Sequence, residues 1–536
     1  MKKLILVCFA LFTFSSSLLA QSWLWGKAGY GSLKSNTIGG WVSTDKKGNA
    51  YMSGSFDNAV DFPPFSLVAS SDNSFLVRYN SAGKVSWAIV PVTSDNYGTP
   101  NAVDTAGNVY ITGTGGVSGA FFLMKLDTNG NTIWNIALTN GDGHGVATDK
   151  RGYTYVIGGF RGSVTLGSYT VLDTGAAAGS QIFFAKVDGS GHVIWVRQST
   201  GDSTIIISRC LIRADNEGNV YVACTFNYGI YFGANYFFSP YPRNGVILAK
   251  YDSSGNLKWV VNPKVPYSCS SATVRGITTD NANNVYLNGF FSDSITFGAH
   301  VLANNRGNWT MYLAKFDAVN GNNIWAEQSM NNSESSDLTS DRNNNIYVGC
   351  WSQGNLTFGG MTFNTPQPSS GIIKLDTSGK AICGSLMKIV AGSAGIACDS
   401  MGRYFYLAGE TTDTAYAGPD TLVPTHGGDI PFIARWQSCG SQNNEGINNL
   451  KSNGEGVVLY PNPNNGQFTI KSSGLSAKSS VEVYNMLGEK IYSRQWTANN
   501  GQCTIDLSNN ANGIYLYRVV NESGNLTGEG KFVIQR

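Results

Sequence analysis

A ten-residue pattern, Asp-x-x-Gly-Asn-x-Tyr-x-x-Gly, recurs along the chain and constrains its fold more than any other feature. Its copies begin, about 59 residues apart, at Asp45, Asp104, Asp149, Asp215, Asp280, Asp341 and Asp399. Three residues after each aspartate stands a glycine or an asparagine, the residues that adopt a positive φ at the least cost. An aspartate that opens a tight turn and a left-handed residue at the fourth position together close a β-hairpin. Each copy therefore predicts a strand, a tight turn and a second strand.

Each copy continues into a second hairpin of the same kind. An apolar run ends in Asp or Asn, a glycine follows, and then a tryptophan, as in FFAKVDGSGHVIW, which ends at Trp195. The sixth copy carries Cys383 where the tryptophan is expected. Two hairpins give four strands per copy, and four-stranded units repeated at this spacing are typical of β-propeller blades.

The seventh copy stops at Trp436 without a fourth strand, and the segment QSWLWGKAG near the N-terminus matches the missing strand through Trp25. We therefore predict an all-β fold, a seven-bladed β-propeller over residues 21–437 with four-stranded blades, in which the N-terminal strand closes blade seven. Closure removes an exposed sheet edge. The tight turns then share one face, and the opposite face carries the variable loops, with a notch beside the short blade two. Binding residues usually lie on such loops.

The repeats resemble those of a bacterial β-propeller repeat family, called SBBP-like, on segments such as GVATDKRGYTYVIG, GITTDNANNVYLNG and GGDIPFIARW. The resemblance implies the propeller architecture. It implies no activity, because propellers host enzymes, lectins and protein-binding platforms alike.

The first twenty residues have the order of a secretory signal peptide. Lys2 and Lys3 precede an apolar run over residues 4–14, and small residues lead to a predicted cleavage site between Ala20 and Gln21. Beyond this run, no apolar stretch reaches the length of about 18 residues that indicates a transmembrane helix. The net charge is +2 and charged residues make up only 13% of the chain, so we expect no nucleic-acid partner.

The composition changes after the repeats. Residues 438–455 are polar and rich in Gly and Asn, which indicates a linker. Residues 456–536 alternate short strands and turns, which predicts a small immunoglobulin-like β-sandwich.

This last segment resembles the type A C-terminal sorting domain of the type IX secretion system. The residues that carry the resemblance are Tyr460, Pro461, Asn462, Pro463, Gly466, Gly488, Leu507, Gly513, Tyr515 and Lys531. The resemblance implies contact with the secretion machinery and export through the periplasm to the cell surface or the medium. It further implies removal of this domain, with a cleavage point expected in the 438–455 linker, and often attachment of the remainder to surface lipopolysaccharide.

Few residues suggest chemistry. Asp142 and His144 lie two residues apart on a variable loop. We favour their interpretation as ordinary polar loop residues over a role in acid–base catalysis or metal binding. Each tight turn offers one or two carboxylates, fewer than calcium needs, so we predict no metal and no cofactor. Cys210 and Cys224 flank the Asp215 turn and could pair, but buried free thiols are the favoured interpretation.

Aromatic residues outside the repeat are better binding candidates, because those at repeat positions belong in blade cores. Blade four is the richest in them, with Tyr228, Tyr231, Tyr236 and Tyr241, and they predict a carbohydrate or peptide site.

These observations favour an exported, monomeric, non-enzymatic binding platform for an unidentified glycan or protein. One alternative is a polysaccharide hydrolase or lyase that draws on the loop carboxylates Asp142, Asp202, Glu334 and Asp337. Another is an architectural spacer without a ligand. Two or more of these carboxylates gathered at the channel mouth would favour the enzyme.

Overall fold

Every regular element of the computed structural model is a β-strand among the residues it describes. These are residues 23–31, 38–69, 73–91, 99–115, 120–173, 181–201, 207–239, 243–266, 271–304, 308–365, 368–389, 392–399, 402–424, 429–439, 458–471, 479–485, 489–495, 502–520 and 526–536. No membrane-spanning helix occurs within these ranges. The chain divides into two compact units, Met1–Ser441 and Gln442–Arg536.

The described part of the first unit contains seven four-stranded antiparallel sheets, which we call blades. Blades one to three are β3 (Ile38–Thr44), β4 (Ala50–Phe56), β7 (Asn73–Tyr79) and β8 (Val85–Ile89); β9 (Asn101–Val103), β10 (Val109–Gly115), β11 (Ala120–Leu126) and β12 (Thr132–Leu138); β13 (Gly141–Thr148), β14 (Thr154–Phe160), β17 (Gln181–Val187) and β18 (Val193–Gln198).

Blades four to seven follow the same order from the innermost strand outward. They are β20 (Ile207–Ala214), β21 (Val220–Phe226), β24 (Gly245–Tyr251) and β25 (Leu257–Val261); β26 (Ala272–Thr279), β27 (Val285–Phe291), β30 (Thr310–Phe316) and β31 (Asn323–Gln328); β32 (Ser333–Ser340), β33 (Ile346–Ser352), β36 (Ser369–Leu375) and β37 (Ala381–Lys388); β38 (Ser393–Cys398), β39 (Tyr404–Thr411), β42 (Ile430–Gln437) and β1 (Trp23–Ala28).

A short excursion hairpin joins the second and third strands of every blade except blade two. These hairpins are β5–β6 (Ala59–Phe62, Phe65–Val68), β15–β16 (Ser163–Leu166, Tyr169–Leu172), β22–β23 (Tyr228–Phe232, Asn235–Ser239), β28–β29 (Asp293–Phe297, His300–Asn304), β34–β35 (Leu356–Phe358, Met361–Phe363) and β40–β41 (Ala415–Ala417, Asp420–Leu422). Two short strands, β2 (Tyr30–Gly31) and β19 (Thr200–Gly201), extend the hairpins β5–β6 and β22–β23.

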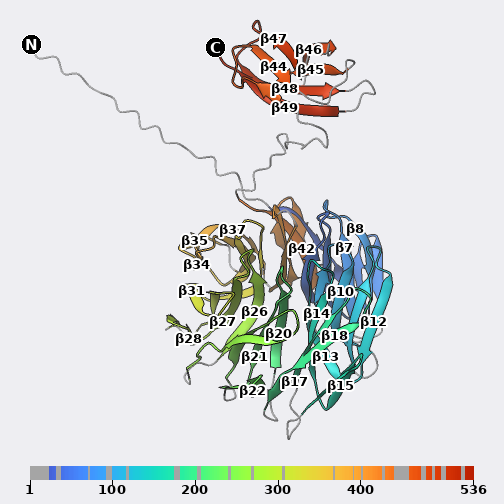
Figure 1. Ribbon diagram of the computed structural model, residues 1–536, viewed down its shortest axis with the longest axis vertical. Coiled ribbons are helices and arrows are strands. Elements are labelled where there is room, and N and C mark those ends of the chain that lie inside the picture. The colour runs from blue at the N-terminus through green and yellow to red at the C-terminus, as the bar shows by residue number, and fades with distance from the viewer. Residues whose placement is uncertain are drawn as a thin grey trace, which may run out of the picture. The chain divides into compact units, whose positions relative to one another are not determined.

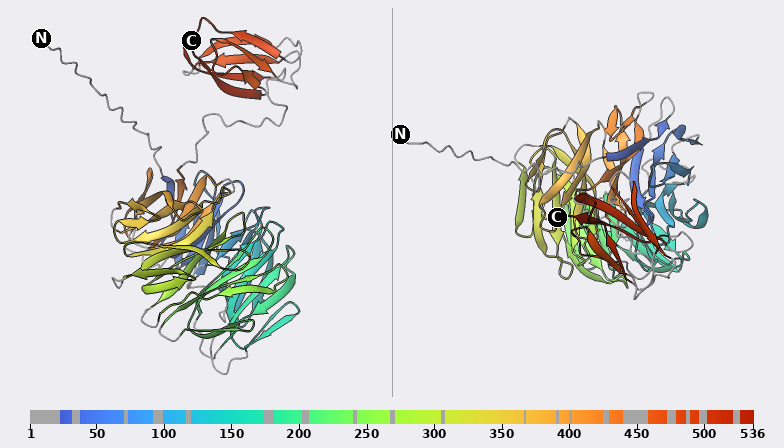
Figure 2. Two further views of the ribbon diagram at one scale, coloured as in Figure 1. Left: turned by 60° about the vertical axis from the view of Figure 1, so that its left-hand side comes forward. Right: turned by 90° about the horizontal axis from the view of Figure 1, so that it is seen from above.

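The innermost strands lie side by side in the order β3, β9, β13, β20, β26, β32 and β38, and β38 returns to β3 (Figures 1 and 2). Strand β1 pairs with β42, with Lys27 opposite Ile433 and Ala28 opposite Phe432. The N-terminal strand therefore completes the last of the seven four-stranded sheets, and the predicted all-β propeller fold is confirmed.

The Asp-x-x-Gly-Asn-x-Tyr pattern has one structural explanation. In the Asp215 turn, carboxylate Oδ1 accepts hydrogen bonds from the backbone amides of Glu217 and Asn219, each at 2.9 Å. Oδ2 accepts one from Asn219 Nδ2 at 2.8 Å and one from the Tyr221 hydroxyl at 3.1 Å. The tyrosine hydroxyl donates to the aspartate in all of the first six copies, at 2.9–3.2 Å. The turn residue three after the aspartate has a positive φ in every copy, including Asn283 and Asn344.

A second repeated contact joins six of the seven blades to the blade that follows. The tryptophan Nε1 of an outer strand donates to a turn carbonyl of the following blade at 3.0–3.3 Å, from Trp25, Trp87, Trp134, Trp195, Trp259 and Trp325. In several blades a third-strand lysine donates to the same oxygen; Lys186 Nζ and Trp195 Nε1, for example, both reach the Ser253 carbonyl. We call this paired contact the latch.

Blade six has the lysine bond of the latch but lacks the tryptophan bond. Lys374 Nζ donates to the Cys439 carbonyl at 3.1 Å, but Cys383 replaces the tryptophan and forms a disulfide with Cys439. A covalent bond thus joins blades six and seven where the tryptophan hydrogen bond is missing.

Cys210 and Cys224, directly opposed on β20 and β21, also form a disulfide. The interpretation of these two residues as free thiols was wrong, because the register of the hairpin brings their Cα atoms to 4.3 Å. Cys350 is a buried free thiol.

The second unit contains two antiparallel sheets that share one core. One holds β43 (Val458–Tyr460), β44 (Gln467–Lys471) and β47 (Gln502–Asp506), and the other holds β46 (Lys490–Gln495), β45 (Ser480–Tyr484), β48 (Gly513–Val520) and β49 (Leu526–Ile534). Ile470 and Ile505 of the first sheet pack in one cluster with Val483 and Phe532 of the second. The immunoglobulin-like topology stays a prediction.

Candidate functional site

The innermost strands present their unpaired backbone edges to the central channel. Side chains of adjacent blades satisfy several of these groups. Thr148 Oγ1 donates to the Val103 carbonyl at 3.0 Å, and Ser340 Oγ donates to the Thr279 carbonyl at 2.8 Å. Exposed strand edges otherwise invite pairing with other chains, so these bonds stabilise the channel wall.

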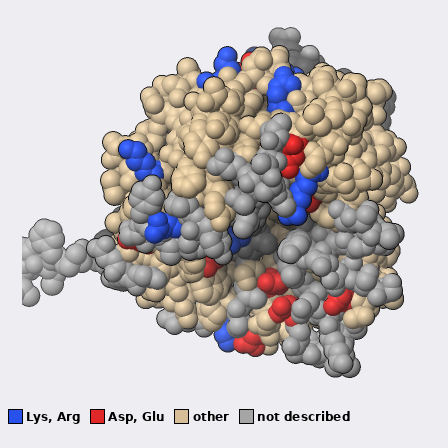
Figure 3. All heavy atoms as spheres, turned by 90° about the horizontal axis from the view of Figure 1, so that it is seen from below, with Lys and Arg blue, Asp and Glu red and all other residues tan. Residues whose placement is uncertain are grey.

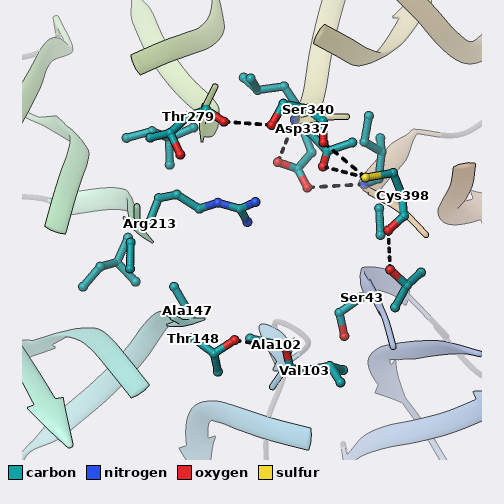
Figure 4. Close-up of a pocket in the computed structure, with 18 of the residues that line it drawn as sticks. Ser43, Ala102, Val103, Ala147, Thr148, Arg213, Thr279, Asp337, Ser340 and Cys398 are labelled. Atoms are coloured by element: carbon teal, nitrogen blue, oxygen red, sulfur yellow. Dashed lines mark hydrogen bonds between the residues drawn. The ribbon is translucent and has the colours of Figure 1, made fainter. Parts of the chain in front are cut away.

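A cavity of about 450 Å³ occupies the channel between the innermost strands and reaches the tight turns. Figure 4 shows Arg213 of β20 extending into it, with Asp337 and Cys398 on other parts of the wall. Asp337 accepts hydrogen bonds from the backbone amides of Leu338 and Ile396, at 2.8 and 3.3 Å. Burial raises the pKa of the Cys398 thiol to about 11, so this cysteine is protonated at neutral pH and is a poor nucleophile.

The turn aspartates at the rim of this cavity already hold several donors each. Within the described ranges, no group of three or more His, Cys, Asp or Glu side chains is placed to hold a metal ion. The rim therefore offers hydrogen-bonded carboxylates whose lone pairs are largely in use.

Asp142 and His144 contact each other on β13, with Nε2 of the imidazole 2.8 Å from Oδ2 of the carboxylate. Burial opposes ionisation of Asp142, but the hydrogen bond and charge of His144 outweigh it and lower the pKa of the carboxyl. The pairing register skips His144, between Gly143 and Gly145, which marks a β-bulge. The other innermost strands except β9 show a register shift near the same level, and bulges often re-aim side chains beside functional sites.

Three of the four carboxylates considered for an enzyme are described, and they come from two blades that are not neighbours. Asp142 belongs to β13 of blade three, Glu334 and Asp337 belong to β32 of blade six, and Asp202 lies outside the described residues. Burial raises the pKa of Glu334, although Arg275 lies close enough to oppose the shift.

Figure 3 shows the end of the ring that carries the hairpins β15–β16 and β22–β23. The surface is hollowed near its centre, and charged groups are scattered around the hollow.

The outward face of the excursion hairpins differs among blades at one equivalent register position. Cross-strand pairs there are Asp61–Ser66, Thr165–Thr170, Tyr231–Tyr236, Thr296–Val301, Thr357–Thr362 and Tyr416–Thr421. At this outward position, only blade four of the six hairpins places two aromatic rings opposite each other, with centroids 4.7 Å apart. Tyr236 is 45% exposed and Phe238, on the same outward face, is 53% exposed.

We call Tyr231, Tyr236 and Phe238 the aromatic face of blade four. Tyr228 begins β22 at a positive φ and is half-buried, and Tyr241 lies outside the described residues. The repeat tyrosines, such as Tyr221 and Tyr286, are buried, and the outer-strand tryptophans Trp134 and Trp325 are partly buried. The sequence signal for Phe238 was its two-residue spacing from Tyr236, which places both side chains on one face of a strand.

The residues that resemble the sorting motif hold the second unit together. Asn462 Oδ1 accepts from the Val533 amide at 2.9 Å, and Asn462 Nδ2 donates to the Lys531 carbonyl of β49 at 3.3 Å. Both flanking prolines, Pro461 and Pro463, follow cis peptide bonds. The start of the unit is thus tied to its last strand.

Two further motif residues have local roles. Gly466 has a φ of 103°, and a Cβ there would come within 2.6 Å of Ser508 Cα. Tyr515, near the start of β48 at Gly513, donates its hydroxyl to the Ala511 carbonyl at 2.7 Å and stacks on Phe532. Tyr460 is 43% exposed. Gly488, like Ala20 and Gln21 of the predicted signal-peptide cleavage site, lies outside the described residues.

Residues 458–535 match the family model of the secretion system C-terminal sorting domain. This match indicates export by the type IX secretion system to the cell surface or the medium, and contact with its machinery. No curated protein sequence matches the chain. The resemblance of the repeats to the bacterial β-propeller repeat family stays a prediction.

Several solved structures are similar at low identity. The Dos1 propeller is 8% identical, with 77% of this chain and 94% of that chain covered and a TM-score of 0.38. A subtype N11 neuraminidase-like protein of influenza A/flat-faced bat/Peru is 10% identical, with 78% and 95% covered and a TM-score of 0.37. PorZ, a surface component of the type IX secretion system of Porphyromonas gingivalis, is 13% identical, with 93% and 70% covered and a TM-score of 0.30. Similarity at this level assigns no activity.

Proposed function

We propose that this chain is an exported β-propeller that acts as a non-enzymatic binding platform, with a carbohydrate ligand held on the aromatic face of blade four. The ring spans residues 21–437 in this proposal, and the sorting domain over residues 456–536 delivers it. Residues 438–455 form the linker, and cleavage there would leave the ring on surface lipopolysaccharide or free in the medium.

The proposal rests on the outward cross-strand pair of the excursion hairpins, which is aromatic on both strands in blade four and in no other of the six hairpins. Six hairpins share a scaffold with a buried inward residue next to the turn, such as Phe232 or Phe297. In blade four the outward position carries two contacting tyrosines, with Phe238 beside them. Aromatic rings present a large apolar face with a polar tip, and stacking contributes about 0.5–1.5 kcal/mol per ring pair.

A catalytic role is less well supported than a binding role. The described carboxylates considered for catalysis lie on blades three and six, and Asp337 is held by two backbone amides. The Asp142–His144 pair has no nucleophilic partner among the contacts of the described residues.

The test is a glycan array probed with the full exported chain and with the double variant Tyr231→Ala/Tyr236→Ala. Loss of two stacking rings should weaken binding of the recognised glycan by about tenfold or more. Tyr416→Ala is the matched control, because Tyr416 occupies the same position as Tyr231 but faces Thr421.

Equal binding by the wild type and the double variant would contradict the proposed site, as would an equal loss in the Tyr416→Ala control. Release of new reducing ends from the bound glycan would contradict the non-enzymatic role.

A further inference from the structure

Arg213 differs in size and charge from the residues at the equivalent position of the other six copies. It stands two residues before the turn aspartate, on the innermost strand β20. The six equivalent positions hold small residues, namely Ser43, Ala102, Ala147, Thr278, Thr339 and Ala397. No requirement of the blade calls for a guanidinium there, since six blades form without one.

The guanidinium extends into the channel cavity and is exposed to it (Figure 4). Among the described residues, no hydrogen bond or ion pair reaches it, and the dashed bonds of Figure 4 connect other groups of the wall. The rim aspartates are engaged in their turns, and Asp337 is engaged by the Leu338 and Ile396 amides. Arg213 therefore brings a positive charge and a fork of donors to a 450 Å³ cavity, with no carboxylate bound to them.

The rest of the wall is suited to a hydroxyl-bearing ligand. Ser43, Thr148 and Thr279 line the cavity together with backbone edges of the innermost strands. A guanidinium matches a planar carboxylate with two parallel hydrogen bonds. Lys150 and Arg342 also line the cavity, each directly after a turn aspartate. The Arg213 guanidinium balances a single negative charge, whereas a doubly charged phosphate would leave excess charge beside Asp337. The cavity also lies within the range of volumes typical of small-molecule sites.

We propose that the channel cavity binds a monocarboxylate sugar acid, with its carboxylate on Arg213 and its hydroxyls on the surrounding threonine and serine side chains and backbone edges. This site is separate from the aromatic face of blade four, and either can exist without the other.

The experiment titrates the full exported chain with D-glucuronate, D-glucose and inorganic phosphate in a calorimeter. D-glucuronate should bind once per chain, and D-glucose and phosphate should each bind at least tenfold more weakly. Arg213→Ala and Arg213→Gln should each weaken D-glucuronate binding at least tenfold, because either change removes the charge. Arg161→Ala removes an exposed arginine that does not line the cavity and should leave binding unchanged.

Thermal melting of each variant first establishes that it is folded. Unchanged D-glucuronate binding in both Arg213 variants would overturn the proposal, as would phosphate binding tighter than D-glucuronate or no D-glucuronate binding to the wild type. The Tyr231→Ala/Tyr236→Ala variant should bind D-glucuronate like the wild type, which separates a failure here from a failure at blade four.

Discussion

The turn end of the ring and the excursion hairpins use repetition in opposite ways. At the turn end, the same side chains make the same bonds in successive blades, as Asp215 with Tyr221 and Asp280 with Tyr286 do. In the hairpins, the backbone repeats while the outward pair changes from Thr165–Thr170 to Tyr231–Tyr236. Repeated residues whose bonds are all internal hold the ring together. Residues that vary on a repeated scaffold are the ones through which a ligand can be distinguished.

Removal of a turn carboxylate tests the structural half of this comparison most strongly. Asp215→Ala removes the acceptor of two backbone amides. It also removes the shorter of two bonds from the Asn219 side chain and from the buried Tyr221 hydroxyl, which keep Glu217 Oε2 at 3.4 Å and the Asn283 carbonyl at 3.3 Å. Buried donors without partners cost about 1–3 kcal/mol each, so we expect the free energy of unfolding to fall by about 2–4 kcal/mol. Urea denaturation followed by tryptophan fluorescence measures this.

Asp252→Ala is the matched control, because Asp252 opens a second-hairpin turn with the same backbone bonds but lies at the surface and holds no tyrosine. Its loss should cost less than about 1 kcal/mol, since water replaces the acceptor. Equal losses for the two variants would mean that the tyrosine contact adds nothing to the turn.

The disulfide between blades six and seven gives the next largest effect. Cys439→Ser removes the Cys383–Cys439 disulfide, which closes a loop of 56 residues. This disulfide joins blades six and seven at the place where other blades have the tryptophan hydrogen bond. Cross-links of this size typically contribute about 2–4 kcal/mol, so the melting temperature should fall clearly under oxidising conditions.

A reducing agent should lower the melting temperature of the wild type further than that of Cys439→Ser, because the variant has only the Cys210–Cys224 disulfide left to lose. Cys350→Ser, at a buried free thiol, is the comparison for a cysteine change without a cross-link. A wild-type melting temperature unaffected by Cys439→Ser would show that the Lys374 bond alone fastens these blades.

The repeat predicted the fold because its spacing reflects local chemistry. The positive φ at the third position after Asp and the pair of hairpins follow from residues near one another in sequence. The closing strand pairs the two ends of the repeat region, and it was predictable because the segment through Trp25 matches the strand that the seventh copy lacks. The bond from Tyr to Asp could also have been inferred, since a six-residue separation is fixed in six copies.

Contacts between blades were harder to predict. The Cys383–Cys439 disulfide joins residues from different copies, and nothing near Cys383 indicates its partner. The bulges that skip His144 and Arg275 are seen only in the pairing register of β13 with β14 and of β26 with β27. Arg213 did leave a signal, as the one charged residue two positions before the aspartate that opens a copy of the repeat, but its significance required the cavity.

Glu410 is a largely buried carboxyl that, unlike the turn aspartates, should make the stability of the protein depend on pH around neutrality. Glu410 of β39 is largely buried, and among the described residues its Oε2 has no hydrogen-bond partner. Burial, with a smaller contribution from Asp429, raises the pKa of Glu410 to about 7. The unfolded chain ionises this carboxyl near pH 4.5, so its contribution is fully present below that pH. Stability is lost as the pH rises through about 7.

Glu410→Gln should therefore remove this loss and stabilise the protein by about 1–2 kcal/mol at pH 8, with little change near pH 4.5. Melting temperatures of the two proteins across this range provide the measurement. Parallel curves for the variant and the wild type would show that Glu410 does not titrate as its burial requires.

The smallest expected effect on stability is the one that most sharpens the comparison. Tyr231→Ala/Tyr236→Ala removes side chains that are 37% and 45% exposed, while the inward Phe232 stays buried beneath them. Substitutions at such surfaces usually change stability by about 0.5 kcal/mol or less, so the urea midpoint should barely move although glycan binding is lost. A loss comparable to that of Asp215→Ala would place these tyrosines with the residues that hold the ring together, and the aromatic face would then have a structural explanation.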